Sequence, residues 1–350
     1  MNGRIWWNRI TNPAQFIEDT SDELISSESV ILRLPEKLPW EEDFFESLRT
    51  SLEKYGSERT FKTVSAEGVT SPGDFLMEQF FTESERNKCW LPTYHTYENF
   101  MAQNSETVMN HRYVCVSNIE PGMVQDWVDS INSYLSSIND AKDERGVFIL
   151  IVRSSGEIEK GELKEYCYSS YVTDFDCLLF CQTLLSSQKL STIQKEYISH
   201  LAFNIAGNDY ELAGVFAGYG LELANHPYRT AEKVFADSGK KVTNLKEKVN
   251  SALWNAQIKV IFPRMENERR ILVEKYYKDL KKCLPIKNIN GDKIEDPLEL
   301  EVGHIFMLAN KRRFADWGDY RMLEIMKDAR NALAHLEAIS FTALEDMSIF

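Results

Sequence analysis

The first 155 residues alternate between strand-like and helix-like hydrophobic patterns. Short apolar, β-branched runs predict strands, and apolar residues spaced three and four apart predict the helices between them. The run at 146–152 is apolar at nearly every position, which is typical of a strand covered on both faces in a parallel sheet. We therefore expect a three-layer α/β domain with a mostly parallel sheet. Its strands are predicted near 29–34, 60–64, 112–116 and 146–152, and its clearest helices near 40–54 and 123–138.

After residue 157 the strand patterns fade and helical spacing dominates. Helices are predicted near 174–185, 192–206 and 210–223, and the polar segment 226–241 favours a boundary. Four further helices are predicted to form a compact C-terminal bundle, near 245–262, 265–283, 296–314 and 318–336. Pro263 is expected to kink or end the first of them. The predicted division is an α/β domain at 1–155, a helical lid-like region at 156–240 and a helical bundle at 241–350.

Composition favours a globular cytoplasmic protein. The 350 residues are 43% hydrophobic and 27% charged, without the run of about 18 apolar residues that a membrane helix needs. The N-terminus lacks the apolar core of a signal peptide. The six cysteines include no Cys-x-x-Cys, so we expect reduced thiols and no metal site. Because the chain has no long apolar run, we also expect no membrane partner.

The net charge of −14 is unevenly distributed. Residues 250–350 contain 16 basic and 16 acidic residues and are therefore neutral. Residues 1–249 contain the other 24 basic and 38 acidic residues, and so the whole net charge of −14. An acidic body disfavours non-specific binding of nucleic acid along its surface. A polyanion would approach the C-terminal third more easily.

The segment after the first predicted strand lacks the chemistry of a nucleotide site. A phosphate-binding loop needs glycines, whose backbone amides surround the phosphates, and a Lys-Ser/Thr pair. Residues 34–42, Leu-Pro-Glu-Lys-Leu-Pro-Trp-Glu-Glu, contain two prolines, three acids and no glycine. Val152 is followed by Arg-Ser-Ser instead of an acidic pair. We therefore expect no ATP hydrolysis and no cofactor.

The order of the predicted parts nevertheless resembles an AAA-like ATPase over residues 20–225. An α/β body is followed by a helical region that begins with Asp-Phe-Asp-Cys-Leu-Leu-Phe at 174–180. The resemblance rests on this order and on no intact motif, and it implies a pseudo-ATPase that serves as a sensor or scaffold. An unrelated α/β binding domain is the alternative interpretation. Either would offer a surface for a protein partner.

The last predicted helix carries a polar cluster in Asp-Ala-Arg-Asn-Ala-Leu-Ala-His-Leu-Glu, residues 328–337. Asn331 and His335 are four residues apart and share one face of a helix, with Arg330 beside them. A histidine moves protons near neutral pH, an arginine grips a phosphate with two donors, and an amide orients either one. Cleavage of RNA without a metal needs these functions: a base for the 2′-OH, a charge on the phosphate and an acid for the leaving oxygen.

These residues resemble the HEPN superfamily, named for its higher-eukaryote and prokaryote nucleotide-binding members. Its ribonucleases carry Arg-x(4–6)-His on the last long helix of a small bundle, usually with a polar residue after the arginine. Arg330, Asn331 and His335 fit this pattern, and the resemblance covers residues 246–350. It implies that these three residues are catalytic and that the protein works as a homodimer or larger assembly through the bundle. Many active members are toxins or effectors of phage defence.

Together, these patterns and the resemblance predict a metal-independent endoribonuclease controlled by a pseudo-ATPase domain, with RNA as substrate. Lys311, Arg312 and Arg313 are predicted to steer the RNA. The helix dipole explains them equally well, because it favours cations at a helix C-terminus. Apolar residues near the C-terminus favour self-association: Ile339, Phe341, Leu344, Ile349 and Phe350. The alternative is a non-enzymatic scaffold subunit of a defence complex. In that interpretation Arg330 pairs with Asp328 or Glu337, and His335 caps its helix.

Overall fold

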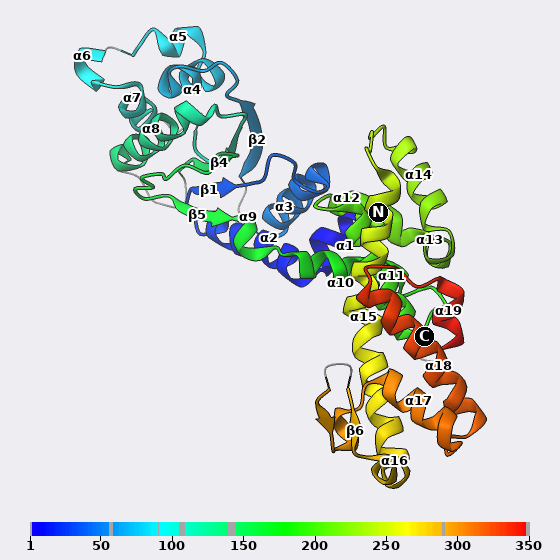
Figure 1. The fold of residues 1–350 in the computed structure, drawn as a ribbon. Coiled ribbons are helices and arrows are strands. Elements are labelled where there is room, and N and C mark those ends of the chain that lie inside the picture. Colours follow the sequence, from blue (N-terminus) through cyan, green and yellow to red (C-terminus); the bar gives the residue numbers. More distant parts are fainter. Residues whose placement is uncertain are drawn as a thin grey trace. The chain divides into compact units, whose positions relative to one another are not determined.

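The computed structural model describes residues 2–55, 59–89, 91–104, 109–138, 145–288 and 291–347 (Figure 1). The chain divides into two compact units, Met1–Asp176 and Cys177–Phe350. Helix α10 (Asp174–Leu185) spans the point of division. The three-part division expected from the sequence stays a prediction.

The first unit is built on a single parallel sheet of five strands in the order β2-β3-β4-β1-β5. Val30 of β1 lies opposite Ile149 on one side and Lys164 on the other, so β1 is an interior strand. Every residue of β4 is buried, as its continuous apolar run predicts. The four predicted strands are confirmed. The strands are β1 (Val30–Arg33), β2 (Thr60–Ser65), β3 (Arg112–Ser117), β4 (Val147–Val152) and β5 (Lys164–Cys167).

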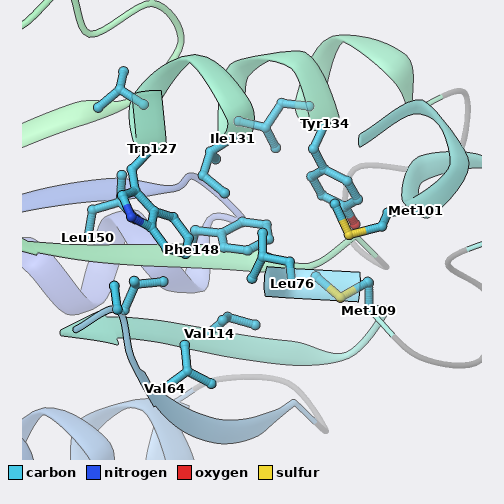
Figure 2. Packing of buried hydrophobic residues seen from close by; sticks show 14 of the residues in the cluster. Val64, Leu76, Met101, Met109, Val114, Trp127, Ile131, Tyr134, Phe148 and Leu150 are labelled. Atoms are coloured by element: carbon cyan, nitrogen blue, oxygen red, sulfur yellow. The ribbon is translucent and has the colours of Figure 1, made fainter. Parts of the chain in front are cut away.

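One face of the sheet is covered by helices that follow β2 and β3 in the chain. Figure 2 shows Trp127 and Ile131 of α8 packed over Phe148 and Leu150 of β4. Phe148 and Leu150 are two residues apart and point to the same face of the sheet, because successive residues of a strand point to opposite faces. The helices in this part of the chain are α4 (Pro72–Phe80), α5 (Glu83–Arg86), α6 (Leu91–Tyr94), α7 (Tyr97–Gln103) and α8 (Val124–Ser137), the last preceded by a 3-10 turn at Pro121–Met123.

The other helices of this unit bury an aromatic cluster. Phe16 lies 5.8 Å from Phe44 and 5.9 Å from Tyr168 between ring centroids, and Trp7 lies 4.9 Å from Phe44. Its helices are α1 (Asn2–Arg9), α2 (Thr11–Ile25), α3 (Glu41–Tyr55) and α9 (Tyr168–Tyr171). The predicted helices at 40–54 and 123–138 are thus confirmed as α3 and α8. The coarse prediction of an α/β region with a parallel sheet, followed by a helical region, is confirmed as well.

The second unit is helical and is organised along α15 (Leu245–Lys275), which packs against α11, α14 and α18. A two-stranded antiparallel hairpin, β6 (Ile286–Lys287) and β7 (Lys293–Ile294), interrupts the helices. The helices are α11 (Thr192–Ala206), α12 (Tyr210–Gly218), α13 (Leu221–Asn225), α14 (Pro227–Asp237), α16 (Tyr277–Cys283), α17 (Val302–Arg312), α18 (Trp317–Ala334) and α19 (Phe341–Asp346).

Two details of the predicted helices are wrong, and a further helix was not predicted. Helix α15 does not end at Pro263 but continues to Lys275, because Ile261, Met265 and Leu272 on both sides of the proline are buried and hold the helix in place. The polar segment 226–241 contains helix α14, whose buried face packs on α15. Asp296 does not begin the long helix. It caps a 3-10 turn (Pro297–Glu299), and α17 starts at Val302.

In the described parts of the chain, every helix is too short or too polar to traverse a lipid bilayer.

Candidate functional site

Helix α18 carries the Arg330, Asn331 and His335 cluster, and its position is fixed by buried contacts. Asp316 caps its first turn by accepting a hydrogen bond from the Asp319 amide at 2.9 Å. Its buried stripe packs against α15 and α17 (Figure 1). Near its other end, the indole N–H of Trp254 on α15 donates to the Leu333 carbonyl at 2.9 Å. The last turn, where the polar cluster lies, is therefore anchored to α15.

The helix ends in a Schellman turn in which His335 is the capping residue. The Leu336 amide donates to the Leu333 carbonyl at 3.2 Å, and the Glu337 amide donates to the Ala332 carbonyl at 2.9 Å. Leu336 occupies the left-handed position with φ of 61°, where glycine is the usual residue. Its side chain is 72% exposed. A strained, exposed turn thus directly follows the histidine.

The segment after this turn is held by a buried amide that sequence patterns did not single out. The side chain of Gln257 on α15 donates to the Ile339 carbonyl and accepts from the Ile339 amide, each at 2.8 Å. Gln257 is fully buried. A buried amide that meets both backbone groups of one residue fixes the chain locally, because leaving either group unpaired is costly. The path of residues 336–341 is therefore set by α15.

Asn331 and His335 are both exposed and lie one helical turn apart, as their spacing predicts. Within the described residues, neither side chain has a hydrogen-bond or ion-pair partner. The His335 amide bonds to the Asn331 and Ala332 carbonyls, so its backbone is satisfied by the helix end. Both side chains are thus available to a ligand.

Arg330 is placed differently from the other two residues. Its guanidinium lies 2.8 Å from the Glu301 carboxylate, and its side chain is 39% exposed. The pairing with Asp328 or Glu337 considered from the sequence is wrong: Glu301, which caps α17, is the partner. Five residues of helix separate Arg330 from His335, which turns them about 140° apart around the axis. A single chain therefore presents the arginine and the histidine on different sides of α18.

Arg330 faces a hollow of about 360 Å³ between α15 and the start of α17. A second arginine also lines it, but that one is occupied. Arg269 donates to the Leu300 carbonyl at 2.9 Å and pairs with Glu266 at 2.8 Å. Among the described residues, Arg330 is bonded through one surface ion pair alone, and such a pair is easily exchanged.

The predicted RNA-steering residues lie at the end of α17 and in the turn that follows. Lys311, Arg312 and Arg313 are all exposed, and among the described residues none has a carboxylate partner. Arg313 adopts a left-handed backbone with φ of 54° and ends the helix.

The apolar C-terminal residues are largely covered within one chain. Phe341 is 8% exposed and Leu344 is fully buried, so the expectation that one domain leaves them uncovered is wrong for both. Ile349 and Phe350 lie outside the described residues.

The loop after β1 is closed by an arginine of the same unit. Arg153, which follows β4, donates to the Glu36 carbonyl at 3.1 Å and to the Pro35 carbonyl, and it pairs with Glu41 at 2.6 Å. Glu41 is the first residue of α3, so its carboxylate and the arginine occupy the helix N-terminus where a phosphate would bind.

A hollow of about 500 Å³ lies nearby at the carboxyl ends of β1 and β5. In open parallel sheets this edge is where ligands usually bind. Its cations Arg33 and Lys160 both contact Glu165, at 2.7 and 2.6 Å. The Glu165 pKa is lowered, because the hydrogen bonds and charges of Lys160 and Arg33 outweigh the effect of burial. Glu165 therefore engages both cations within the chain and offsets one of their two positive charges.

Comparison with known proteins adds no relative. No family model matches the chain, and no curated protein matches its sequence. Among the described residues, no cluster of three or more His, Cys, Asp or Glu side chains is arranged to hold a metal ion.

Proposed function

We propose that the chain is a metal-independent endoribonuclease of HEPN type that cuts RNA when two copies pair through the C-terminal helices. The observation that carries the proposal is the exposed pair Asn331 and His335 at the anchored end of α18, both without partners in the described chain. Exposed polar groups on a fixed helix end are already positioned for a ligand, so binding them does not require the helix to rearrange.

The chemistry assigned to the residues is a transfer within the RNA strand. The 2′-oxygen attacks the adjacent phosphorus while His335 takes its proton, and the bond to the 5′-oxygen breaks. A second histidine, from the paired copy, returns a proton to that oxygen. Arg330 stabilises the charge that develops on the phosphate, and Asn331 orients the phosphate or the imidazole. The products are a 2′,3′-cyclic phosphate and a 5′-hydroxyl.

Pairing of two copies is part of the proposal, since one chain places Arg330 and His335 on different sides of α18. A two-fold arrangement would bring the arginine of one copy toward the histidine of the other. The first unit, as a pseudo-ATPase sensor or scaffold, would control this pairing through a protein partner.

The test is cleavage of single-stranded RNA by the full chain in the presence of EDTA. His335→Ala should lower the rate by about 10²–10⁴, the range for loss of a general acid–base group. The substitution is exposed, so the free energy of unfolding should stay the same. His226→Ala, which removes an exposed histidine next to α14 that caps no helix through its side chain, is the matched control. An equally active His335→Ala protein contradicts the proposal.

The competing proposal is a non-enzymatic scaffold subunit. The Arg330–Glu301 ion pair favours it, because an arginine held by a carboxylate has a structural role without any substrate. A protein that cuts no RNA at any concentration, but is destabilised by Arg330→Ala, would support this alternative.

A further inference from the structure

The most exposed large apolar side chain in the described residues is Trp317, at the start of α18. It is 79% exposed, although tryptophan is costly to leave in water. Its ring is stacked on Tyr320, with centroids 6.3 Å apart and planes 24° apart. Tyr320 in turn lies 5.2 Å from Phe306 of α17, at 32°. Three rings of similar orientation thus form a short series with Trp317 at its exposed end.

Unpaired positive charge adjoins this series of rings. Lys311, Arg312 and Arg313 come just before Trp317 in the chain, are exposed, and lack carboxylate partners in the described residues. The Lys327 ammonium lies 4.5 Å from the centre of the Phe306 ring. Three cations that are unpaired in the described chain thus precede the exposed end of the series, and a fourth, Lys327, which is paired with Asp328, lies against the ring at its other end.

Each of the nearby carboxylates contacts a cation. Asp316 and Asp319 both contact Lys275, at 2.8 and 2.5 Å, and they cap or border the first turn of α18. Glu324 pairs with Arg321 at 2.8 Å. Lys327 also contacts Asp328, at 3.1 Å. Asp316 and Asp319 share one ammonium, so one of their negative charges is uncompensated, and the three cations at 311–313, unpaired in the described chain, exceed it. The local charge is therefore positive and attracts anions.

Two of the rings, Trp317 and Tyr320, lie on the same face of α18 as the candidate catalytic pair. Residues three, four and seven apart share a helix face, and one such stripe contains Trp317, Tyr320, Glu324, Asp328, Asn331 and His335. From Tyr320 to Asn331 the helix advances about 16 Å. A ligand that binds the rings and follows this face would reach Asn331 and His335.

We propose that Trp317, Tyr320 and Phe306 form a stacking platform for the bases of single-stranded RNA, and that Lys311, Arg312 and Arg313 bind its phosphates. Bases stack on exposed aromatic rings, and cations follow the backbone; this is the usual combination in single-strand binding. A protein partner would need the apolar ring but would gain little from three unpaired cations. The direction of the strand toward His335 rests on the proposed ribonuclease function, whereas the binding itself does not.

Binding is measured with the full chain and a fluorescent 2′-O-methyl oligouridine, which lacks the hydroxyl needed for cleavage. Trp317→Ala should weaken binding about 5- to 150-fold, the range for loss of one stacked base. Trp317→Phe should retain most of the affinity because it keeps a ring. Ile271→Ala, which removes an exposed apolar side chain from α15, should change nothing. A duplex of the same length should bind more weakly than the single strand.

The charge component is measured through salt. Replacing Lys311, Arg312 and Arg313 by glutamine should reduce the slope of log K against log salt by about 2, since each phosphate contact on a single strand contributes about 0.7. An unchanged slope, or a Trp317→Ala protein that binds as tightly as wild type, overturns the platform. So does a Trp317→Ala protein that loses self-association in sedimentation while its RNA affinity is unchanged, because the surface would then be a protein interface.

The outcome is independent of catalysis. His335→Ala should bind the uncleavable strand as wild type does. A protein that binds this strand through Trp317 but cuts no RNA keeps the platform and rejects the ribonuclease proposal. A protein that cuts RNA but binds the uncleavable strand without the help of Trp317 keeps the ribonuclease proposal and rejects the platform.

Discussion

Arg330 and Glu301 form an ion pair of 2.8 Å between α18 and the capping residue of α17. Both side chains are partly exposed, at 39% and 58%, so the pair is weak and the arginine is able to exchange it for a phosphate. The carboxylate nevertheless competes with any phosphate that approaches Arg330.

Glu301→Gln should therefore strengthen RNA binding. The gain should be at most about fivefold, because an exposed ion pair contributes about 0–1 kcal/mol. Glutamine keeps a side-chain oxygen for the α17 cap, so the fold should be preserved. Titration of the uncleavable strand measures the effect, and Glu299→Gln in the same segment is the control. Weaker binding by Glu301→Gln would mean that Glu301 orients Arg330 for the substrate and does not compete with it.

Leu336 offers a test of the turn that follows His335. Its left-handed backbone costs an L-residue about 1–2 kcal/mol, which glycine avoids at a smaller entropic cost. Leu336→Gly should raise the free energy of unfolding by about 0.5–1 kcal/mol in urea titrations. Leu336→Ala keeps the strain and should bring no gain. Equal effects of the two substitutions would show that the exposed side chain matters and the backbone does not.

The sequence predicted some parts of this molecule and not others, for physical reasons. The buried strand β4 was predictable because every one of its residues is apolar, whereas β5, Lys-Glu-Tyr-Cys, is a partly exposed edge strand and has no such run. The predicted end of a helix at Pro263 was wrong, because a rule based on local sequence does not include the buried contacts that continue α15 through the proline.

The candidate site shows the same limit. The four-residue spacing of Asn331 and His335 predicted their shared face. The partner of Arg330 lies 29 residues away in the chain, and Gln257 meets Ile339 across 82 residues, so no local pattern indicates either contact. Trp317 could have been identified from the sequence, because an aromatic residue on the polar side of an amphipathic helix indicates a binding surface.

Stability should depend on pH through His200 of α11. Burial lowers the pKa of its imidazole below the usual 6.5, Lys259 lowers it further, and Glu196 partly opposes them. Its Nδ1 is buried without a hydrogen-bond partner among the described residues. The folded state thus binds the proton less tightly than the unfolded chain. The free energy of unfolding is therefore highest above about pH 6.5. It decreases as the pH falls from there toward the lowered pKa of His200 in the folded state.

Urea unfolding at pH 7.5 and pH 5.5 measures this dependence. His200→Gln should show a smaller loss of stability between the two values than the wild-type protein, and His335→Gln controls for removing a histidine as such. An unchanged difference in His200→Gln would assign the pH dependence to other groups.

The protein should neither bind ATP tightly nor hydrolyse it. The cations at the carboxyl edge of the sheet are paired within the chain, Arg153 with Glu41 and Arg33 with Glu165, so a triphosphate would have to break these pairs. The loop after β1 also contains no glycine to surround a phosphate. Isothermal titration with ATP and magnesium is the measurement. A dissociation constant in the low micromolar range would contradict this prediction.

Mixing two inactive variants tests whether the ribonuclease site is shared between copies. Arg330 and His335 are turned about 140° apart on α18, so the proposed site combines the arginine of one copy with the histidine of its partner. Neither Arg330→Ala nor His335→Ala alone should cut RNA. In a mixed dimer, however, the intact arginine of one chain faces the intact histidine of the other. Half of the dimers in an equal mixture are mixed, and each has one site that pairs an intact arginine with one intact histidine, without the second histidine. Water must then supply the proton that the second histidine would give, so the mixture should recover measurable activity well below about a quarter of the wild-type rate.

A site contained within one chain gives a different result, because every chain in the mixture lacks one essential group and no activity returns. Sedimentation of the wild-type protein under the assay conditions completes the test. The rate per chain should fall as dilution separates the dimers, since a lone chain holds one histidine where cleavage needs both a base and an acid. A protein that sediments as a monomer and cuts RNA at its full rate would exclude a shared site, and Arg330 would then have to reach the phosphate by leaving Glu301 within its own chain.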